Sequence, residues 1–92
     1  MTDMTERVTH QVTYEDLAAL MKRTAGVHVE PADLEARAAE GFDSFGLDSL
    51  GLLGIVAELE KRYGAGLPEQ VERCKTPEAF LAMVNDALAT GV

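Results

Sequence analysis

The pattern of apolar and polar positions predicts a first helix over residues 14–25. Its apolar residues recur every three or four positions: Tyr14, Leu17, Ala18, Met21 and Ala25. Thr13 and Asp16 form an approximate capping box at its start, and Gly26 is placed to end it. The polar residues 1–12 show no period, and we interpret them as a loose leader.

A long connection, residues 30–47, follows this helix and contains Pro31, Gly41 and Gly46. Its stretch 32–40 has a helix-forming composition, which predicts a turn or two of helix there. A connection this long in a small domain is usually functional or packed by its own side chains. Three apolar residues are available for such packing: Leu34, Phe42 and Phe45.

A second long helix is predicted from Asp48, as its N-cap, to Tyr63, with Gly64 just after its end. One side carries a full apolar stripe: Leu52, Ile55, Val56, Leu59 and Tyr63. Another side carries a second apolar row, joined by Gly51 and Gly54: Leu50, Leu53 and Ala57. The pattern by itself favours burial of this row against another helix, and the alternative is an exposed apolar patch beside Ser49.

Two further helices complete the chain. Residues 69–73 predict a short one, and Thr76-Pro77-Glu78 is a typical start of a last helix. The apolar stripe of that last helix is Phe80, Leu81, Val84 and Leu88. Because no alternating strand pattern appears, we predict an all-α fold, a small four-helix bundle with three main helices and a short third one. Its single domain covers residues 1–92, with one core.

Composition and charge narrow the possible functions. The chain has 92 residues and a net charge of −8, so the phosphates of a nucleic acid would repel it while basic protein surfaces would attract it. Its one cysteine, Cys74, can form no internal disulfide, and a lone cysteine is more typical of packing than of chemistry. No stretch approaches the ~20 apolar residues of a membrane span. We expect a monomeric cytoplasmic protein that binds neither nucleic acid nor membrane.

Two Asp-Ser pairs occur in the segment FDSFGLDSLGLLG, residues 42–54, and only the second lies at a predicted helix start. Ser49 would be the first residue of that helix, where unpaired N–H groups and the positive end of the helix dipole favour an attached phosphate. Ser44 lies within the connection. A serine at a helix start is also common as a simple turn or capping residue, and the pattern leaves that alternative open.

Other chemistries lack their required residues. A hydrolase turn needs a glycine two positions before its serine, where this chain has Leu47, and it also needs a preceding strand. His10 and His28 lie in the leader and in a loop, so neither is placed as a catalytic base. Asp43 to Asp48 lacks the ligand pattern of a calcium loop, and Cys74 has no companion at metal-binding spacing. We expect no catalytic residue and no metal site.

The residues FDSFGLDSL, 42–50, resemble the signature of acyl carrier proteins, in which Gly-x-Asp-Ser-Leu opens the second helix. The resemblance covers about residues 14–88. It includes the Arg62-Tyr63-Gly64 end of that helix, the Leu-Pro loop and the Thr-Pro start of the last helix. Asp-Ser-Leu alone is a weak motif, but together with Gly46, the core stripe, the length and the acidity it is specific.

This resemblance implies that Ser49 is the attachment site of 4′-phosphopantetheine, which a magnesium-dependent phosphopantetheinyl transferase would deliver from coenzyme A. The thiol of that arm would hold acyl groups as thioesters, so the chain would be a carrier without catalysis of its own. Asp48 matches the acid that caps the helix and helps the transferase to recognise it. Leu50 matches an apolar residue that partners contact.

Within the family, the length and both helix motifs are most similar to carriers of type II aromatic polyketide synthases from actinomycetes, which serve antibiotic or pigment biosynthesis. The tail from Cys74 to Asn85 is similar to spore-pigment systems. The implied partners, besides the transferase, are a malonyl transferase, a ketosynthase with its chain-length factor, and tailoring ketoreductases or cyclases. A fatty-acid carrier and an unmodified helical interaction module are the alternatives.

The sequence departs from the family where carriers commonly place acids, on the exposed face soon after the serine. Gly51 and Gly54 occupy two such positions, and acids return only at Glu58 and Glu60. We hypothesise an exposed, apolar partner-binding face that the glycines keep smooth, with acids at its edges that steer the encounter. The residues assigned to partner binding are Leu50, Gly51, Leu53, Gly54, Ala57, Glu58 and Asp43.

Overall fold

A computed structural model describes residues 11–64 and 66–89, and all their regular structure is helical. The α-helices are α1 (Tyr14–Ala25), α2 (Pro31–Ala36), α3 (Ser49–Tyr63) and α4 (Pro77–Ala89). Two 3₁₀ helices, η2 (Phe42–Phe45) and η3 (Glu69–Arg73), lie in the connections. The predicted all-α fold is confirmed, and its short elements are more numerous than the sequence indicated.

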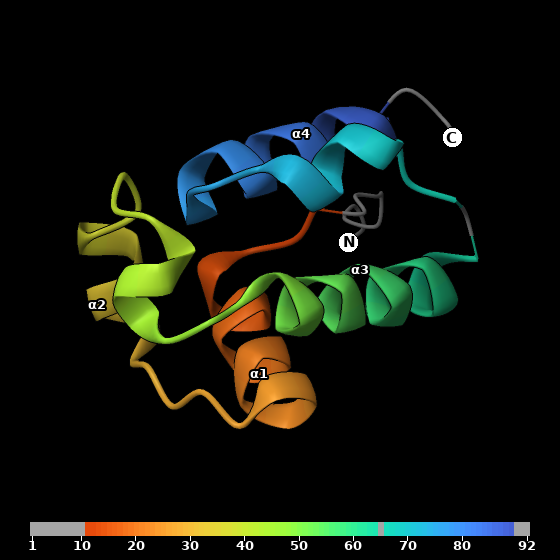
Figure 1. The fold of residues 1–92 in the computed structure, drawn as a ribbon. Helices are drawn as coiled ribbons and strands as arrows, with labels where there is room; N and C mark the ends of the chain where they lie inside the picture. The colour runs from red at the N-terminus through yellow and green to blue at the C-terminus, as the bar shows by residue number, and fades with distance from the viewer. Residues whose placement is uncertain (1–10, 65, 90–92) are drawn as a thin grey trace, which may run out of the picture.

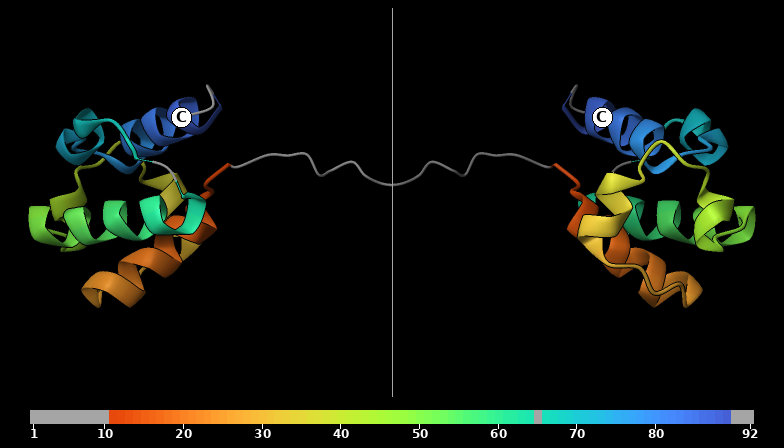
Figure 2. Two further views of the ribbon diagram at one scale, coloured as in Figure 1. Left: turned by 90° about the vertical axis from the view of Figure 1, so that its right-hand side faces the viewer. Right: turned by 90° about the vertical axis from the view of Figure 1, so that its left-hand side faces the viewer.

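Helix α3 runs through the middle of the bundle (Figure 1). Helix α1 packs on one side of it, and η3 packs on the other, next to α4. The side views show the same order, with α3 between α1 and the layer of η3 and α4 (Figure 2). Both faces of α3 that meet these layers must therefore be apolar or small, and the face that meets neither is open to solvent.

The two long helices that flank the serine segment begin and end as predicted. At the start of α1, Thr13 Oγ1 accepts a hydrogen bond from the Asp16 N–H, and the Asp16 carboxylate accepts one from the Thr13 N–H, both at 3.1 Å. Gly26 and Gly64 end α1 and α3 with φ angles of 70° and 64°. Such left-handed ends suit glycine, which has no Cβ to clash.

The connection between α1 and α3 contains the short helix that the sequence predicted, with different bounds. Its α-helix starts at Pro31 and ends at Ala36, and a separate 3₁₀ turn follows at η2. The short third helix expected over residues 69–73 is also a 3₁₀ helix, and its residue Val71 is fully buried. Propensity predicted helical backbone here, but short elements take the tighter 3₁₀ form where few residues are available.

The serine-bearing connection is fixed to the start of α4 by the backbone. The Phe42 N–H donates to the Lys75 carbonyl at 2.8 Å, and the Glu78 N–H donates to the Ala38 carbonyl at 3.0 Å. The rings of Phe42 and Phe80 meet edge to face with centroids 5.8 Å apart. The segment that leads to α3 therefore has a defined position relative to α4.

Arg37 holds the outer side of this connection. Its guanidinium pairs with Asp33 at 3.1 Å and with Glu40 at 2.9 Å, and it lies 4.6 Å from the centre of the Phe45 ring. Leu34 and Phe42 are buried and Phe45 is partly buried against the core. The expectation that the connection is packed by its own side chains is confirmed for these three apolar residues.

The leader expected over residues 1–12 lies mostly outside the described residues. Val12, however, is buried at 2% exposure. Its N–H donates to Asn85 Oδ1 at 2.6 Å and its carbonyl accepts from Asn85 Nδ2 at 3.0 Å. Residue 12 therefore belongs to the fold, because it is tied to α4. None of the described helices is long and apolar enough to cross a membrane.

Candidate functional site

Ser49 is the first residue of α3, and its side chain is exposed. Asp48 precedes it as the N-cap, with extended backbone, and its Oδ1 accepts a hydrogen bond from the Gly51 N–H at 2.8 Å. The predicted helix start is thus confirmed. A hydroxyl at this position faces the positive end of a 15-residue helix, where an attached phosphodiester is electrostatically favoured.

The chain reaches this position through a tight turn. Gly46 ends η2 with a φ angle of 84°, a left-handed conformation that favours glycine. Leu47 follows it and is buried at 3% exposure, so it holds the backbone immediately before the cap. The Leu47 N–H donates to the Phe42 carbonyl at 3.2 Å. Ser44 lies within η2, exposed, at no α-helix start.

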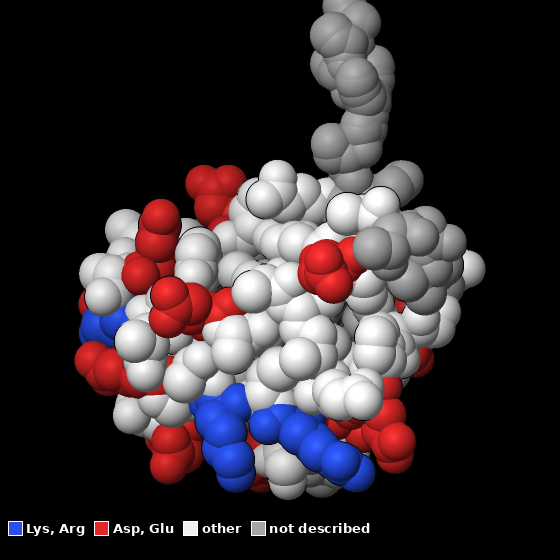
Figure 3. Space-filling model, turned by 90° about the horizontal axis from the view of Figure 1, so that it is seen from above, with Lys and Arg blue, Asp and Glu red and all other residues white. Residues whose placement is uncertain are grey.

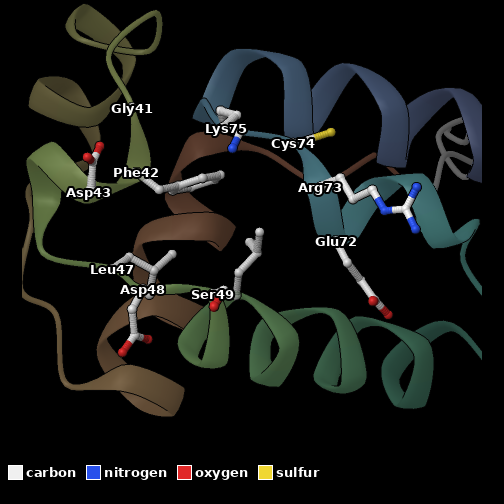
Figure 4. Close-up of a pocket in the computed structure, with 11 residues that line it drawn as sticks. Gly41, Phe42, Asp43, Leu47, Asp48, Ser49, Glu72, Arg73, Cys74 and Lys75 are labelled. Atoms are coloured by element: carbon white, nitrogen blue, oxygen red, sulfur yellow. The ribbon is translucent and has the colours of Figure 1, made fainter.

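An open groove of about 720 Å³ borders Ser49. It lies between η2, the start of α3 and the connection from η3 to α4. Its apolar lining is made by buried side chains, namely Phe42, Leu47 and Leu52. Its polar lining includes Asp43, Glu72, Arg73 and Lys75. The close-up shows Ser49 at one edge, with the ring of Phe42 and the side chains of Lys75 and Glu72 opposite (Figure 4).

A phosphopantetheine group suits the residues present. Its phosphate would lie at the helix start beside Ser49, and its chain would lie along the apolar lining of the groove. The Asp48 carboxylate points away from the groove and leaves that side of Ser49 open (Figure 4). On the face that carries η3 and α4, basic side chains lie near its edges, and acidic side chains are spread over the face, including beside the basic ones (Figure 3).

The second apolar row of α3 is exposed. Leu50 and Leu53 are 75% and 43% exposed and are the exposed large hydrophobic residues of the described part of the chain. Ala57 is exposed as well. The burial that the pattern alone favoured is wrong for this row, because α1 and η3 cover the neighbouring sides of α3 and no described element covers this one. The exposure of these three residues, which the hypothesis of a partner-binding face requires, is confirmed.

Gly51 does not lie in this row as the hypothesis assumed, whereas Gly54, four residues after Leu50, lies beside it. A Cβ atom on Gly51 would lie 3.1 Å from the Ala25 Cβ and 2.7 Å from Leu47 Cδ1. A Cβ on Gly54 would lie 3.7 Å from the Thr24 Cβ. Gly51 is therefore directed toward the end of α1, and Gly54 lies between that end and the apolar row. Gly51 allows the two helices to approach closely, and Gly54 has space for a methyl group.

The two acids assigned to the partner face, Asp43 and Glu58, and the nearby Glu60 lie in different surroundings. Asp43 is exposed and lines the groove. Glu58 is half-buried, and its Oε2 accepts a hydrogen bond from the Arg23 guanidinium at 2.9 Å. Glu60 Oε2 accepts one from the Leu67 N–H at 2.8 Å. The two carboxylates of α3 therefore hold neighbouring elements of the fold.

Sequence reasoning missed the far wall of the groove. Glu72 and Arg73 line it from the end of η3 and Lys75 from the connection before α4, and neither periodicity nor a motif singled them out. Cys74 lies between them, with its Sγ 3.9 Å from the Met83 Sδ, and burial raises the pKa of its thiol. Packing, rather than chemistry, explains this cysteine. Among residues 11–64 and 66–89, no group of three His, Cys, Asp or Glu side chains is arranged to hold a metal ion.

Comparison with known proteins adds independent evidence. The sequence profile of the family described as "Phosphopantetheine attachment site" matches residues 15–84. A probable acyl carrier protein of Streptomyces halstedii is 79% identical over the whole of both chains. The curamycin polyketide synthase acyl carrier protein of Streptomyces cyaneus is 62% identical, over 96% of this chain and 99% of its own.

A solved structure agrees with the fold. The actinorhodin apo acyl carrier protein from Streptomyces coelicolor superimposes with a TM-score of 0.73 at 34% identity, over 89% of this chain and 96% of its own. These relatives do not favour the alternative of a fatty-acid carrier. The chain belongs to the acyl carrier proteins of the kind found in Streptomyces type II polyketide synthases, a family that carries phosphopantetheine and has no catalysis of its own.

Proposed function

We propose that Ser49 is the residue that carries the phosphopantetheine arm, and that the chain uses it to present polyketide intermediates to partner enzymes. One observation carries this proposal: the exposed Ser49 hydroxyl stands at the start of a capped helix and at the edge of a groove with an apolar lining. Ser44, the other serine of the motif, lies within a 3₁₀ turn and not at the start of an α-helix.

The attachment is a phosphoryl transfer. The Oγ of Ser49 forms a bond to the phosphorus of coenzyme A that bears the pantetheine group, and the pyrophosphate bond to the adenosine bisphosphate breaks. The hydroxyl proton passes to a base of the transferase, and the magnesium ion of the transferase neutralises negative charge on the phosphate oxygens. Asp48 keeps the first turn of α3 ordered through its bond to the Gly51 N–H, and we assign it to transferase recognition as well. Once attached, the arm ends in a thiol, which forms thioesters with acyl groups.

The attachment site is tested by intact mass. After incubation with coenzyme A, magnesium and a transferase of broad specificity, the protein is expected to gain the mass of one phosphopantetheinyl group. Ser49→Ala should gain none, whereas Ser44→Ala, which alters another exposed serine five residues earlier, should be modified like the parent protein. Modification of Ser49→Ala would refute the assignment. An unmodified parent protein under conditions that load a control carrier would support the unmodified interaction module instead.

The proposed partners are a malonyl transferase, a ketosynthase with its chain-length factor, and tailoring ketoreductases or cyclases. The row formed by Leu50, Leu53 and Ala57 supports this, because an exposed apolar surface directly after the serine suits protein contact near the arm. Asp43 at the groove is placed to contribute charge to the encounter. The single domain over residues 1–92, the cytoplasmic location and the spore-pigment relationship stay predictions.

Gly54 allows a test of this face. A longer polar side chain at this position begins beside the apolar row, and its Cβ has space against Thr24. Gly54→Glu is therefore expected to fold and to be loaded, but to weaken transfer to the ketosynthase, measured as the rate of chain extension with the loaded carrier. Gly54→Ala is the matched control. Unchanged transfer by Gly54→Glu would contradict the assignment of this face.

A further inference from the structure

The segment that leads to Ser49 is held by a side-chain contact at each end of η2. At its first residue, the ring of Phe42 packs edge to face on Phe80 of α4. At its last residue, the guanidinium carbon of Arg37 lies 4.6 Å from the centre of the Phe45 ring. Only three residues separate Phe45 from Ser49. The position of the serine therefore depends on both contacts.

The guanidinium of Arg37 is fixed by two carboxylates. Its Nη1 donates a hydrogen bond to Asp33 Oδ2 at 3.1 Å, and its Nε and Nη2 donate to Glu40 Oε1 at 3.2 Å and 2.9 Å. Asp33 lies on α2, and Glu40 lies between α2 and η2. A guanidinium bound along its edges keeps its flat face free to stack on an aromatic ring. Arg37 thus joins α2, the connection and η2 at one point.

The backbone of η2 and the turn after it has few bonds of its own. The N–H groups of Ser44, Gly46 and Leu47 each donate to a carbonyl three or five residues earlier, at 2.9, 3.1 and 3.2 Å. A short 3₁₀ segment with so few bonds opens locally at a low free-energy cost unless side chains hold it. The Arg37 side chain is 38% exposed, so it holds η2 from outside the core. Its removal should loosen η2 and leave the core unchanged.

We propose that Arg37 is a positioning residue for the attachment of phosphopantetheine: it holds η2 in its observed conformation, so that Ser49 stands where the transferase receives it. The inference rests on the proposed function of Ser49. Arg37 acts through Phe45, its contact on η2. A carrier whose η2 is open part of the time offers the transferase a smaller competent fraction, and the apparent dissociation constant rises in proportion. The rate of the bound carrier stays the same, because the transferase supplies the base and the magnesium ion.

Three variants and a control test this inference. Arg37→Gln removes the charge and the stacking, Phe45→Leu removes the ring but keeps an apolar side chain, and a double variant combines both changes. Lys22→Gln is the matched control, because it also removes one positive charge, from an exposed side chain at a different surface. Each carrier is incubated with coenzyme A, magnesium and a transferase of broad specificity, and kcat and KM for the carrier are measured by intact mass. Far-UV circular dichroism verifies that each variant is folded.

Arg37→Gln is expected to have a KM about two- to fivefold higher than that of Lys22→Gln, with an equal kcat, because η2 is open in more of its molecules. Phe45→Leu should raise KM by a similar factor. The double variant should be no worse than either single variant, since both break the same contact. Arg37→Lys should resemble Arg37→Gln, because an ammonium keeps the charge but cannot form the stacked fork.

Amide hydrogen exchange followed by NMR reports the same change without the transferase. Exchange at Gly46 and Leu47 should be faster in Arg37→Gln than in the parent protein, whereas exchange at Leu52, inside α3, should be unchanged. Equal exchange at all three amides would overturn the inference.

The kinetic results can overturn it as well. A KM of Arg37→Gln equal to that of Lys22→Gln would do so. An effect of Arg37→Gln that Phe45→Leu does not share, and that disappears at about 1 M salt, would place Arg37 in direct contact with the transferase instead of on η2. If the parent protein cannot be loaded while a control carrier is, the proposed function fails, and amide exchange still shows whether Arg37 holds η2.

Discussion

Replacing Gly51 with alanine is expected to destabilise the protein, although the same replacement at Gly54 is expected to stabilise it. Both glycines lie inside α3, where alanine has the higher helix propensity. They differ in what a new Cβ would meet. At Gly51 it would lie 2.7 Å from Leu47 Cδ1 and 3.1 Å from the Ala25 Cβ, whereas at Gly54 its nearest neighbour would be 3.7 Å away.

The expected magnitudes follow from these distances. Gly54→Ala should raise the free energy of unfolding by up to about 1 kcal/mol through helix propensity alone. Gly51→Ala gains the same amount but must move the buried Leu47 and the end of α1, and overpacking of this kind costs about 1–3 kcal/mol. The net effect at Gly51 is a loss of about 1 kcal/mol, so the two variants should differ by about 2 kcal/mol.

Thermal unfolding followed by far-UV circular dichroism measures this difference. In a domain of this size, 1 kcal/mol corresponds to about 4–8 °C in Tm, so the Tm values of the variants should lie about 8–16 °C apart. Denaturant unfolding provides the second measurement, with equal m-values as the control for an unchanged fold. If Gly51→Ala is as stable as Gly54→Ala, the close approach of α1 to α3 is not the reason for the glycine, and this argument is refuted.

Three further predictions concern the site and its surroundings. Asp48→Ala should lower the free energy of unfolding by about 1 kcal/mol in denaturant because the cap on Gly51 is lost, while Asp48→Asn should retain most of it; equal losses would contradict a capping role. Leu52→Ala should cost about 2–5 kcal/mol because Leu52 is buried, whereas Leu53→Ala should cost less than about 0.5 kcal/mol, and thermal unfolding that ranks them otherwise would contradict the assigned faces. Burial raises the pKa of Cys74, so the neutral thiol stabilises the fold below the pKa of the unfolded thiol, and this contribution is lost as the pH rises through the raised value. Alkylation of the native protein near pH 8.5, about the pKa of a free thiol, should therefore be slower than alkylation in denaturant, and equal rates would rule out the shift.

The elements that sequence patterns predicted well are those with local start and stop signals. The capping box of α1, the Asp48 cap of α3 and the Thr76-Pro77 start of α4 each act within a few residues, so their boundaries follow from the sequence. Residues 31–36 and 69–73 have weaker local signals. Their helical tendency was predicted correctly, but the bounds of the first and the 3₁₀ form of the second were not. Their form depends on how they pack against α1, α3 and α4, which no local signal encodes.

The candidate site divides in the same way. A helix start with an exposed serine and a capping acid is a local property, and the motif around Ser49 also carried the family resemblance. The groove beside it is not local, because its walls come from η2, α3 and the segment before α4. The roles of Glu58 and Gly51 were also misjudged from the sequence, since their partners Arg23 and Ala25 lie more than 20 residues earlier in the chain.

The sequence by itself determined the helices, the position of the serine at the start of one of them, and the family to which the chain belongs. Helix periodicity, caps and short motifs depend on neighbours within one or two turns, so these features can be derived from a single sequence. Only the tertiary structure decided which side of α3 is covered. α1 and η3 bury two sides of that helix, and the side that they leave open exposes Leu50 and Leu53.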